Sequence, residues 1–324
     1  MQRRTFNTFV AAVGLALSLA SSATLAAWPE GKTLSIVVPY APGGTADALA
    51  RLIGQNLGPK LGTSVVVVNK AGASGVIGAQ AVATAAADGF TVLYDATPFS
   101  INPHLQKLPF DADKDLIPVT QVAVTPMLLT VPKSSPYASA AELMKAAKAA
   151  PGKLTFSTGG QGTVQYMAPE LMNQSAGVSM LHIPYKSGGL AITGTIAGEV
   201  DMGFFNLPAI SGHVKNGLVK ALAITSAQRN PLFPDVPTVA EVIGKPYESY
   251  EWNGVFVPHG TPADIVKRLN AALREVLAMP EIKAKFDSLG SRIVASSPED
   301  FRKYLTAESG RWAATVKAAG IKKE

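Results

Sequence analysis

Strand-like and helix-like segments alternate along most of this 324-residue chain, and the alternation restricts its fold more than any other feature. Apolar runs at residues 34–40, 64–69 and 90–94 are each followed by a turn of glycine, proline or polar residues. Between the first two runs, residues 45–61 place leucine and isoleucine at helical spacing. A strand, a helix and a further strand in this order predict parallel pairing and an α/β fold.

A second series of the same kind follows the long β-prone segment 119–131. Its strand-like runs are residues 154–157, 180–183, 201–205 and 220–224. Two successive series predict two α/β lobes. The proline-rich passage 231–246 suits a connection between lobes and precedes a short strand at 254–257. The remaining C-terminal region is helical in pattern, with Ser297 as the expected N-cap of the last helix.

The first 26 residues predict a cleaved secretory signal. Arg3 and Arg4 precede an apolar run at 9–20, and the small residues at 24–26 suit a signal peptidase. A membrane anchor is the alternative, but the run is shorter than the roughly 20 residues that span a bilayer. The arginine pair leaves the general secretory route and the twin-arginine route both open. We therefore expect a periplasmic protein, which the absence of cysteine allows to fold without disulfides.

Composition and spacing exclude several classes of function. The formal net charge is +6 with scattered lysines and arginines, so nucleic acid is not an expected partner. The histidines, His104, His182, His213 and His259, lack the spacing of a metal site, and no cysteine assists them. The Gly-x-Ser-x-Gly motif, the phosphate loop and a complete dinucleotide fingerprint are absent. We expect no metal, no cofactor and no enzyme, although a serine with remote catalytic partners stays an alternative.

Two glycine-rich turns stand between a predicted strand and a predicted helix, at residues 39–47 and 157–165. Each leaves unpaired backbone amides at the start of a helix, where the helix dipole also attracts anions. Taken singly, such a turn is more often an ordinary connection. One turn in each lobe favours a shared anion site, since ligands of open α/β sheets lie beyond the carboxyl ends of the strands.

Asp47 lies in the first turn of the helix that follows the first glycine-rich turn. A carboxylate there usually pairs with the helix dipole or caps backbone amides. Because it would repel an anion placed against it, we expect the anion over the amides of residues 43–45 and Asp47 behind the turn. Tyr40, Tyr185 and Phe205 lie at strand ends and are candidate apolar walls, although such aromatic residues are as often core.

Several separated motifs, in their order along the chain, resemble the Bug-type receptors of tripartite tricarboxylate transporters. They are Pro-Tyr-Ala-Pro-Gly-Gly-Thr-Ala-Asp at 39–47 with Arg51, Asn-Lys-Ala-Gly-Ala-Ser-Gly at 69–75, Pro-Tyr-Lys at 184–186, Pro-Asp-Val-Pro-Thr-Val-Ala-Glu at 234–241 and Pro-His-Gly-Thr-Pro at 258–262. Ser187 departs from the family pattern, in which a glycine commonly follows the lysine. The resemblance implies an α/β, two-lobed periplasmic binding protein of the type II, or Venus-flytrap, architecture.

The expected lobes are residues 27–125 with 226–324, and residues 126–225. The resemblance implies a carboxylate held between them by the two glycine-rich turns, often with ordered water. Matched by position, the expected ligand-binding residues are Tyr40, Pro42, Gly43, Gly44, Thr45, Asp47, Thr97, Ser100, Asn102, Ser157, Thr158, Gly160, Gly162, Thr163, Tyr185, Asp201 and Phe205. Thr97, Ser100 and Asn102 are expected in a polar turn after the strand at 90–94.

The resemblance also implies a monomer that captures a small carboxylate and delivers it to the membrane subunits of a transporter. The expected mechanism is binding without chemistry, by closure about strands near 121–131 and after residue 223. Dicarboxylates, citrate-like acids and aromatic acids such as terephthalate or nicotinate all suit a backbone-amide site. A sensory partner that presents the same ligand to a membrane kinase, and a periplasmic hydrolase, are the alternatives.

Overall fold

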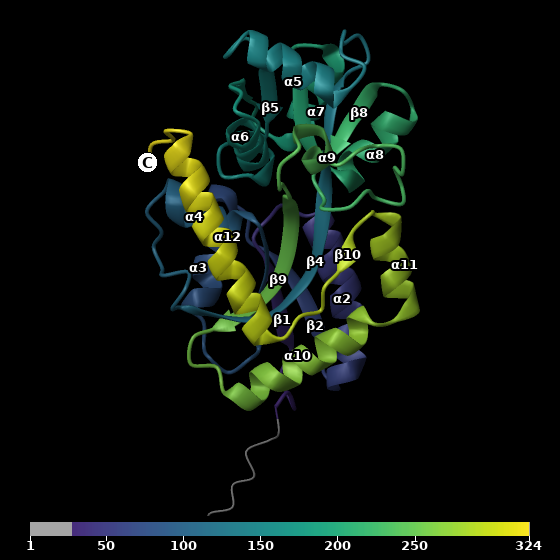
Figure 1. Ribbon diagram of the computed structural model, residues 1–324. Helices are drawn as coiled ribbons and strands as arrows, with labels where there is room; N and C mark the ends of the chain where they lie inside the picture. Colours follow the sequence, from purple (N-terminus) through teal and green to yellow (C-terminus); the bar gives the residue numbers. More distant parts are fainter. Residues whose placement is uncertain (1–27, 324) are drawn as a thin grey trace, which may run out of the picture.

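A computed structural model describes residues 28–323 and shows two α/β lobes, one above the other (Figure 1). The α/β class and the two lobes expected from the alternation of strands and helices are confirmed. The predicted signal peptide, residues 1–26, lies outside the described residues. Within residues 28–323, none of the helices combines the length and the apolar character that crossing a bilayer requires.

The N-terminal lobe, called lobe 1 here, is built on three parallel strands that pair in the order β2-β1-β3. The strands are β1 (Leu34–Val38), β2 (Val65–Asn69) and β3 (Thr91–Ala96). The helical elements of this part are α2 (Thr45–Leu61), the 3-10 turn η1 (Ala73–Gly75), α3 (Val76–Ala83) and α4 (Pro98–Leu105). Later segments complete the lobe: β9 (Tyr250–Pro258), antiparallel to β3, then α10 (Ala263–Leu277), α11 (Pro280–Ser288) and β10 (Arg292–Ile293).

The second lobe, lobe 2, repeats this plan with the strand order β6-β5-β7. Its strands are β5 (Thr155–Thr158), β6 (Leu181–Pro184), β7 (Met202–Asn206) and β8 (Val219–Ile224). Its helices are α5 (Ala140–Ala149), α6 (Val164–Ala176), α7 (Gly188–Ala197), α8 (Leu207–Lys215) and α9 (Val239–Ile243). In both lobes the first two parallel strands are joined through a glycine-rich turn and a helix, as the sequence pattern predicts.

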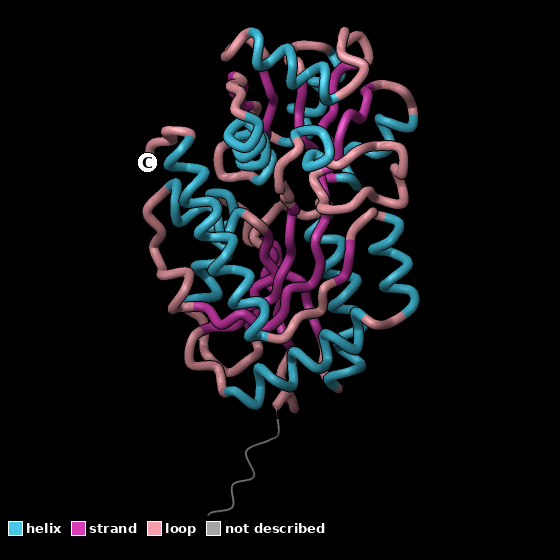
Figure 2. The backbone as a smooth tube through the Cα atoms, viewed as in Figure 1, coloured by secondary structure: helices cyan, strands magenta, loops and turns pink. Residues whose placement is uncertain are grey.

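One long strand, β4 (Leu116–Pro132), runs through both lobes (Figures 1 and 2). Its residues 116–126 pair with β9 in lobe 1, and from Met127 on it pairs with β7 and β8 in lobe 2. The register shifts between Pro118 and Thr120 and between Gln121 and Ala123 are irregularities that bend the strand. The segment 121–131, expected as a hinge, therefore lies within a strand that is continuous from one lobe to the other.

The C-terminal helix, α12 (Pro298–Ala318), also contacts both lobes. Ser297 caps it by accepting a hydrogen bond from the amide of Asp300, as the sequence predicts. Near its start, Phe301 packs with the core of lobe 1, whereas Trp312 and Val316 near its end belong to the core of lobe 2. A helix from the end of the chain thus ties the lobes together, which the sequence pattern did not indicate.

Two segments differ from the sequence-based expectation. Residues 98–105, expected as a polar turn, form the helix α4, because Pro98 suits a first helical position and Phe99, Ile101 and Leu105 are buried along it. The passage 231–246, expected to be irregular and to belong to lobe 1, contains the short helix α9, which packs on the core of lobe 2.

Candidate functional site

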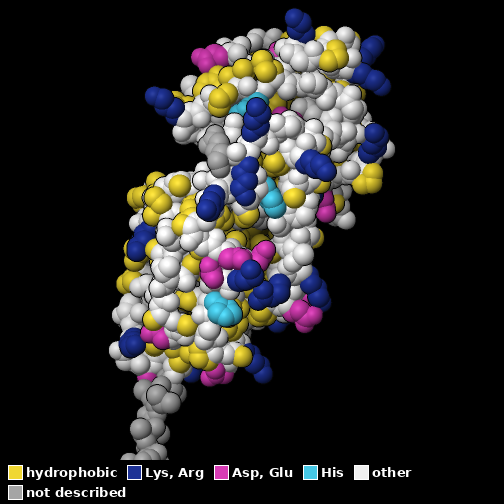
Figure 3. Space-filling view, turned by 90° about the vertical axis from the view of Figure 1, so that its left-hand side faces the viewer, with side chains coloured by type: hydrophobic (Ala, Val, Ile, Leu, Met, Phe, Trp, Pro, Cys, Tyr) yellow, Lys and Arg dark blue, Asp and Glu magenta, His cyan; other side chains and the backbone are white. Residues whose placement is uncertain are grey.

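Strand ends from both lobes meet at the junction between the lobes. On β4, Pro126 pairs with Tyr250 at the start of β9, and the next residue, Met127, pairs with Asn206 at the carboxyl end of β7. The carboxyl end of β3, at Ala96, lies along the same part of β9. Figure 3 shows two bodies joined by a narrower middle. Because ligands of open α/β sheets bind beyond the carboxyl ends of the strands, this junction is the candidate site.

The first glycine-rich turn is held from behind by the carboxylate of Asp47, as predicted. The amide of Gly43 donates to Asp47 Oδ2 at 3.0 Å, and Asn69 Nδ2 donates to Oδ1 at 2.9 Å. Arg51 forms a salt bridge to Oδ1 at 2.9 Å and donates from Nε to Oδ2 at 3.1 Å. Arg51, the Gly43 amide and Asn69 together lower the pKa of Asp47 to about 2. The carboxylate is therefore ionised and fully engaged at neutral pH.

These bonds correct one detail of the expected anion site. Because the amide of Gly43 already donates to Asp47, the donors that this turn can offer to a ligand begin at Gly44. Gly44 is the N-cap of α2 and has extended backbone angles, and no side chain caps the helix start. The first amides of α2 therefore have only water or a ligand to bind.

The second glycine-rich turn is held by neutral hydroxyl groups. Thr158, fully buried at the end of β5, accepts the amide of Gly160 at 3.1 Å and bonds His182 Nε2 at 2.6 Å. Thr163, the N-cap of α6, donates its hydroxyl to the carbonyl of Gly160 at 2.7 Å and leaves the helix start without a side-chain cap. Both lobes thus present an uncapped helix start after a glycine-rich turn.

His182 and Gly159 fix the position of the second turn, His182 through its bond to Thr158 and Gly159 through close packing on α7. The His182 ring lies 4.2 Å from the ring of Tyr166 and 5.3 Å from that of Phe156, between centroids. Burial lowers the pKa of His182 to about 4, so the ring is neutral at physiological pH. Gly159 packs on the start of α7 so closely that a side-chain carbon there would lie 2.5 Å from the amide nitrogen of Gly188. Only glycine fits at this position.

The two lobes touch through the second turn. A side-chain carbon on Gly162 would lie 3.0 Å from both Asn102 Oδ1 and Ser74 Oγ of lobe 1. Asn102 Nδ2 donates to the carbonyl of Ser74 at 3.0 Å and so holds this part of η1. Ala73 and Ser74 both adopt positive φ angles, 47° and 52°, which are uncommon for residues other than glycine. The residues 73–75 therefore form a third turn at the site.

Two acidic side chains, Asp95 and Glu251, lie where β3 and β9 meet at the junction, and this part of the cleft is called its floor here. Asp95, 1% exposed at the end of β3, accepts hydrogen bonds on Oδ1 from the Tyr40 hydroxyl at 2.7 Å and from the Ala96 amide at 2.8 Å. Glu251 lies at the start of β9, opposite Thr125 of β4. Burial raises the pKa of Asp95 to about 7, and burial together with the charge on Asp95 raises the pKa of Glu251 to about 8.

The structure brings many of the expected residues to the junction. They are Tyr40, Pro42, Gly43, Gly44, Thr45, Asp47, Asn102, Thr158, Gly160, Gly162 and Thr163. Their contacts with a ligand stay a prediction.

Other expected residues are buried, and the hydroxyl groups among them already have partners inside the protein. Thr97 accepts the amide of Trp252 at 2.8 Å, and Ser100 donates to the carbonyl of Thr97 at 2.9 Å. Ser157 is fully buried and its hydroxyl bonds Thr195 Oγ1 at 2.8 Å. Phe205, 1% exposed, packs in the core of lobe 2. These side chains stabilise the strand ends and do not face the cleft.

Asp201 and Tyr185 point to places other than the cleft. Asp201 precedes β7, about 16 Å along the strand from Asn206 at the junction, and its carboxylate accepts the amide and hydroxyl of Thr155, each at 2.8 Å. Tyr185 donates its hydroxyl to Glu199 at 2.8 Å and packs on α7. Asp201 lies at the end of its strand that faces away from the cleft. Tyr185 follows the carboxyl end of β6, beside Thr158, but its side chain turns toward α7.

Sequence reasoning missed Ser74, Asp95, Glu251, Asn206 and His182. Asp95 carried a signal, since it directly follows the strand-like run 90–94 and strand ends bind ligands. Asn206 carried the same signal, because it directly follows the run 201–205. Ser74, Glu251 and His182 reach the junction only through strand pairing or through the turn 73–75, which local patterns do not reveal.

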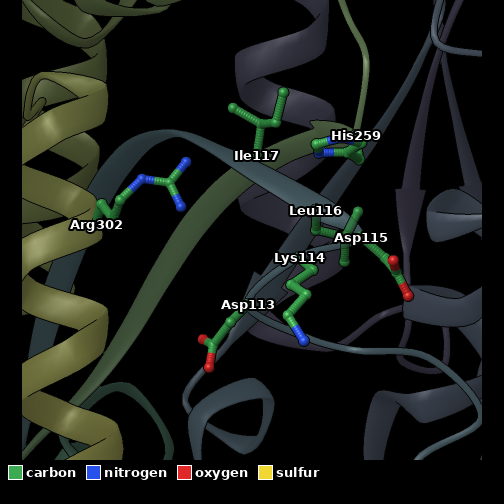
Figure 4. Close-up of a pocket in the computed structure, with 7 residues that line it drawn as sticks. All are labelled: Asp113, Lys114, Asp115, Leu116, Ile117, His259 and Arg302. Atoms are coloured by element: carbon green, nitrogen blue, oxygen red, sulfur yellow. The ribbon is translucent and has the colours of Figure 1, made fainter.

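Two hollows of the surface lie away from the glycine-rich turns. One, of about 540 Å³, lies where β4 begins, between Arg302 of α12 on one side and Asp115 and His259 on the other (Figure 4). The other, of about 980 Å³, lies between loop 226–232 and residues 290–293. None of the residues expected to bind the ligand lines either hollow. Within residues 28–323, no three acidic or histidine side chains are grouped as a metal ion requires.

The chain matches the family described as the tripartite tricarboxylate transporter family receptor over residues 49–321. It is 37% identical to the UPF0065 protein in the tcbD-tcbE intergenic region of Pseudomonas sp. strain P51, over 92% of this chain and 90% of that protein.

Two similar solved structures contain dicarboxylates. The structure of Rpa4515 of R. palustris with adipate is 33% identical, with a TM-score of 0.82 and coverage of 92% of this chain and 100% of that chain. MatC of Rhodopseudomonas palustris with bound malate is 30% identical, with a TM-score of 0.75 and coverage of 89% and 99%.

Proposed function

Since this chain belongs to the tripartite tricarboxylate transporter family of receptors, we propose that it captures a small carboxylate outside the cytoplasm and delivers it to transporter subunits in the membrane. The observation that carries the proposal is the pair of uncapped helix starts, α2 in lobe 1 and α6 in lobe 2, at the junction where strand ends meet. Backbone amides at a helix start bind carboxylates without any charged side chain.

Relatives support the class of ligand. Rpa4515 and MatC, which share this fold and about a third of their residues with this chain, hold adipate and malate. Both ligands are small carboxylates of a size that suits a cleft between two lobes. The predicted signal at residues 1–26 supports export to the periplasm.

Closure of the lobes is the proposed source of affinity. In an open form, the first turn presents its amides from Gly44 onward to a carboxylate. Closure brings Gly162 against Ser74 and Asn102, which excludes water and converts exposed hydrogen bonds into sheltered, charge-assisted ones. The bends in β4 and the contacts of α12 with both lobes limit the path of this motion.

The proposed role is binding without catalysis. Ser157, the serine at the second turn that a hydrolase reading would favour, turns its hydroxyl to Thr195 and the carbonyl of Ala191 inside lobe 2. His182, the nearest histidine, bonds Thr158 instead. This arrangement gives Ser157 neither a base nor access to the cleft.

Calorimetric titration with mono-, di- and tricarboxylates tests the proposal, with an uncharged sugar as the control ligand. We expect heat from at least one carboxylate and none from the sugar. Binding of the sugar with no response to any carboxylate would contradict the proposal. Delivery is tested by uptake of the bound acid into membrane vesicles that contain the transporter subunits, with and without this protein.

A further inference from the structure

The exposed apolar side chains of the two lobes gather on equivalent elements. Within residues 28–323, six large apolar side chains are exposed, and five of them lie on an outermost strand or on the helix that follows it. Lobe 1 has Val66 and Val68 on β2 and Ile77 on α3, and lobe 2 has Leu181 on β6 and Leu190 on α7. Scattered single side chains of this kind need no explanation, whereas a repeated placement indicates an interaction surface.

These elements form the outer sides of the cleft. In the strand order, β2 and β6 are farthest from β4 and β9, the strands that connect the lobes. β2 runs parallel to β1 and β6 runs parallel to β5, so their carboxyl ends lie at the same edge of the sheet as the two glycine-rich turns. The residues that follow β2 and β6 therefore lie on the rim of the cleft, one set in each lobe, on the side away from the hinge.

The sequence of both outer edges is almost without charge. Lys70 is the only Asp, Glu, Lys or Arg among residues 61–87, and Lys186 is the only one among residues 171–198. The chain as a whole is 16% charged, so both segments are strongly depleted. Depletion of charged residues distinguishes the centre of a protein interface from other surface. In each segment, the one charge that remains follows the strand at the rim.

In lobe 1, the lysine stands beside the exposed apolar side chains. Lys70 directly follows β2, and its amide donates to the carbonyl of Val38 at 2.9 Å, which keeps the backbone in the sheet. Because side chains alternate along a strand, Val68 and Lys70 point to the same face. Ile77 covers Gly72, two residues further along, so closely that a side-chain carbon on Gly72 would overlap it. Apolar surface and positive charge thus lie together.

In lobe 2, Ser187 fixes the same combination. It is the N-cap of α7, and its side chain accepts the amide of Leu190 at 3.3 Å. Lys186 directly precedes this cap, so Lys186 and Leu190 flank one helix start. The serine that departs from the family pattern therefore positions the exposed residues of this edge.

Neither lysine has a carboxylate partner in the described part of the chain. Both are exposed, and neither Lys70 nor Lys186 forms a salt bridge within residues 28–323. By contrast, Lys60 at the other end of α2 pairs with Glu275 at 3.0 Å. An exposed cation beside apolar surface complements a partner that carries a carboxylate beside apolar side chains.

Resting on the delivery proposed above, we propose that the outer edges β2–α3 and β6–α7 form the docking surface for a membrane subunit of the transporter. The partner surface presents one carboxylate to Lys70 and another to Lys186, and apolar side chains to Ile77 and Leu190. Because the two edges belong to different lobes, closure of the cleft sets their spacing. A partner that contacts both edges at once therefore binds the loaded, closed receptor more tightly than the empty one.

Uptake into vesicles that contain the membrane subunits tests the docking surface. The receptor is loaded with the radiolabelled carboxylate that gives the largest heat in the calorimetric series, and the uptake rate is measured against receptor concentration. The double variant Lys70→Glu with Lys186→Glu should raise the receptor concentration for half-maximal uptake at least tenfold, and each single variant should raise it less. Added salt should weaken docking of the wild type more than docking of the double variant.

Matched controls separate the edges from the rest of the surface. Ile77→Ser and Leu190→Ser should each raise the half-maximal concentration about threefold. Leu218→Ser removes the sixth exposed apolar side chain, 42% exposed between α8 and β8, and should leave that concentration unchanged. Lys148→Glu on α5 is the control for charge reversal.

Calorimetry and sedimentation distinguish the other possible occupants of the edges. Ligand affinity should change less than twofold in every variant. A tenfold loss of ligand affinity in the lysine variants would mean that the lysines serve the ligand, and would overturn the inference. A wild-type dimer that Ile77→Ser or Leu190→Ser converts to a monomer would assign the edges to a second copy of this chain, and would also overturn it.

The remaining outcomes separate this inference from the proposed function. If the double variant supports uptake at the same half-maximal concentration as the wild type, the docking surface lies elsewhere, and the receptor function stands. If the wild type binds its carboxylate but does not stimulate uptake, the proposed delivery is contradicted, and this inference falls with it.

Discussion

The two glycine-rich turns have the same place in their lobes but are held by different forces. The first turn depends on an ionised carboxylate, Asp47, that binds one amide, one guanidinium and one side-chain amide. The second depends on the hydroxyls of Thr158 and Thr163 and on a neutral histidine. Charge-assisted bonds hold a turn more strongly than neutral ones.

The turns also differ in how their glycines are used. In the first turn, Gly43 has a φ of +86° in open space, so its role is conformational, and Gly44 meets only the carbonyl of Ala41 at 3.8 Å. In the second, a side-chain carbon on Gly159 would lie 2.5 Å, and one on Gly162 3.0 Å, from atoms of other segments. The first turn is a preformed platform, whereas the second is a packed element that touches the opposite lobe. The following predictions test this contrast.

Gly162→Val should have the largest effect. The atoms nearest to the added side chain belong to Asn102 and Ser74 of lobe 1, so we expect it to block closure without unfolding lobe 2. We expect carboxylate affinity to fall at least a hundredfold, about 2.7 kcal/mol. Titration gives the affinity, and small-angle scattering gives the degree of closure. Gly212→Val in α8, where a side chain meets nothing, is the control. Wild-type affinity in Gly162→Val would show that the contact plays no part in binding.

Removing Asp47 from the first turn should lower the free energy of unfolding more than removing the Thr158 hydroxyl from the second. Asp47→Ala leaves the Gly43 amide, Arg51 and Asn69 without their shared acceptor, and we expect it to lower the free energy of unfolding by about 2 kcal/mol. Thr158→Val in the second turn should cost about 1 kcal/mol. Denaturant titration measures both. Equal losses would remove the distinction between a charged and a neutral turn.

Gly44→Val should weaken carboxylate binding about tenfold and leave stability nearly unchanged. The backbone angles of Gly44 suit any residue, and the new side chain has space in the free protein, so the effect arises only where a ligand lies over the helix start. Titration and thermal unfolding are compared on the same sample. Unaltered affinity would mean that the first turn does not contact the ligand.

His182→Gln should have the smallest effect, and only below neutral pH. The pKa of His182 falls from 6.5 to about 4 on folding because the ring is buried. The unfolded state thus binds more protons between these values, and the stability that the neutral ring contributes is lost as pH falls from 6.5 through 4. The pKa of Asp47 is also lowered on folding, from 3.8 to about 2, so the stability that this carboxylate contributes is lost only as pH falls below about 3.8. The difference in unfolding free energy between wild type and variant should therefore change above pH 4; a constant difference would contradict this assignment.

Much of the fold follows from local patterns. The helix predicted at residues 45–61 is α2 with the same bounds, and Ser297 caps α12 as expected. Asp47 supports the first turn because its partners lie within reach of one turn and one neighbouring strand. The helix at residues 98–105 was not predicted because its stability depends on distant residues: Phe99 packs in the core of lobe 1, and Ile101 packs in the core of lobe 2.

The sequence by itself determined the alternation of strands and helices, the two glycine-rich turns and the helix caps, because each depends on residues within a few positions of one another. Only the tertiary structure decided that Asp95 and Glu251 share the floor of the cleft, that Asp201 lies at the far end of its strand, and that α12 joins both cores. These relations depend on which strands pair and which end of a strand faces the cleft. Residues distant in the sequence settle both when they pack together, and no local pattern records that packing.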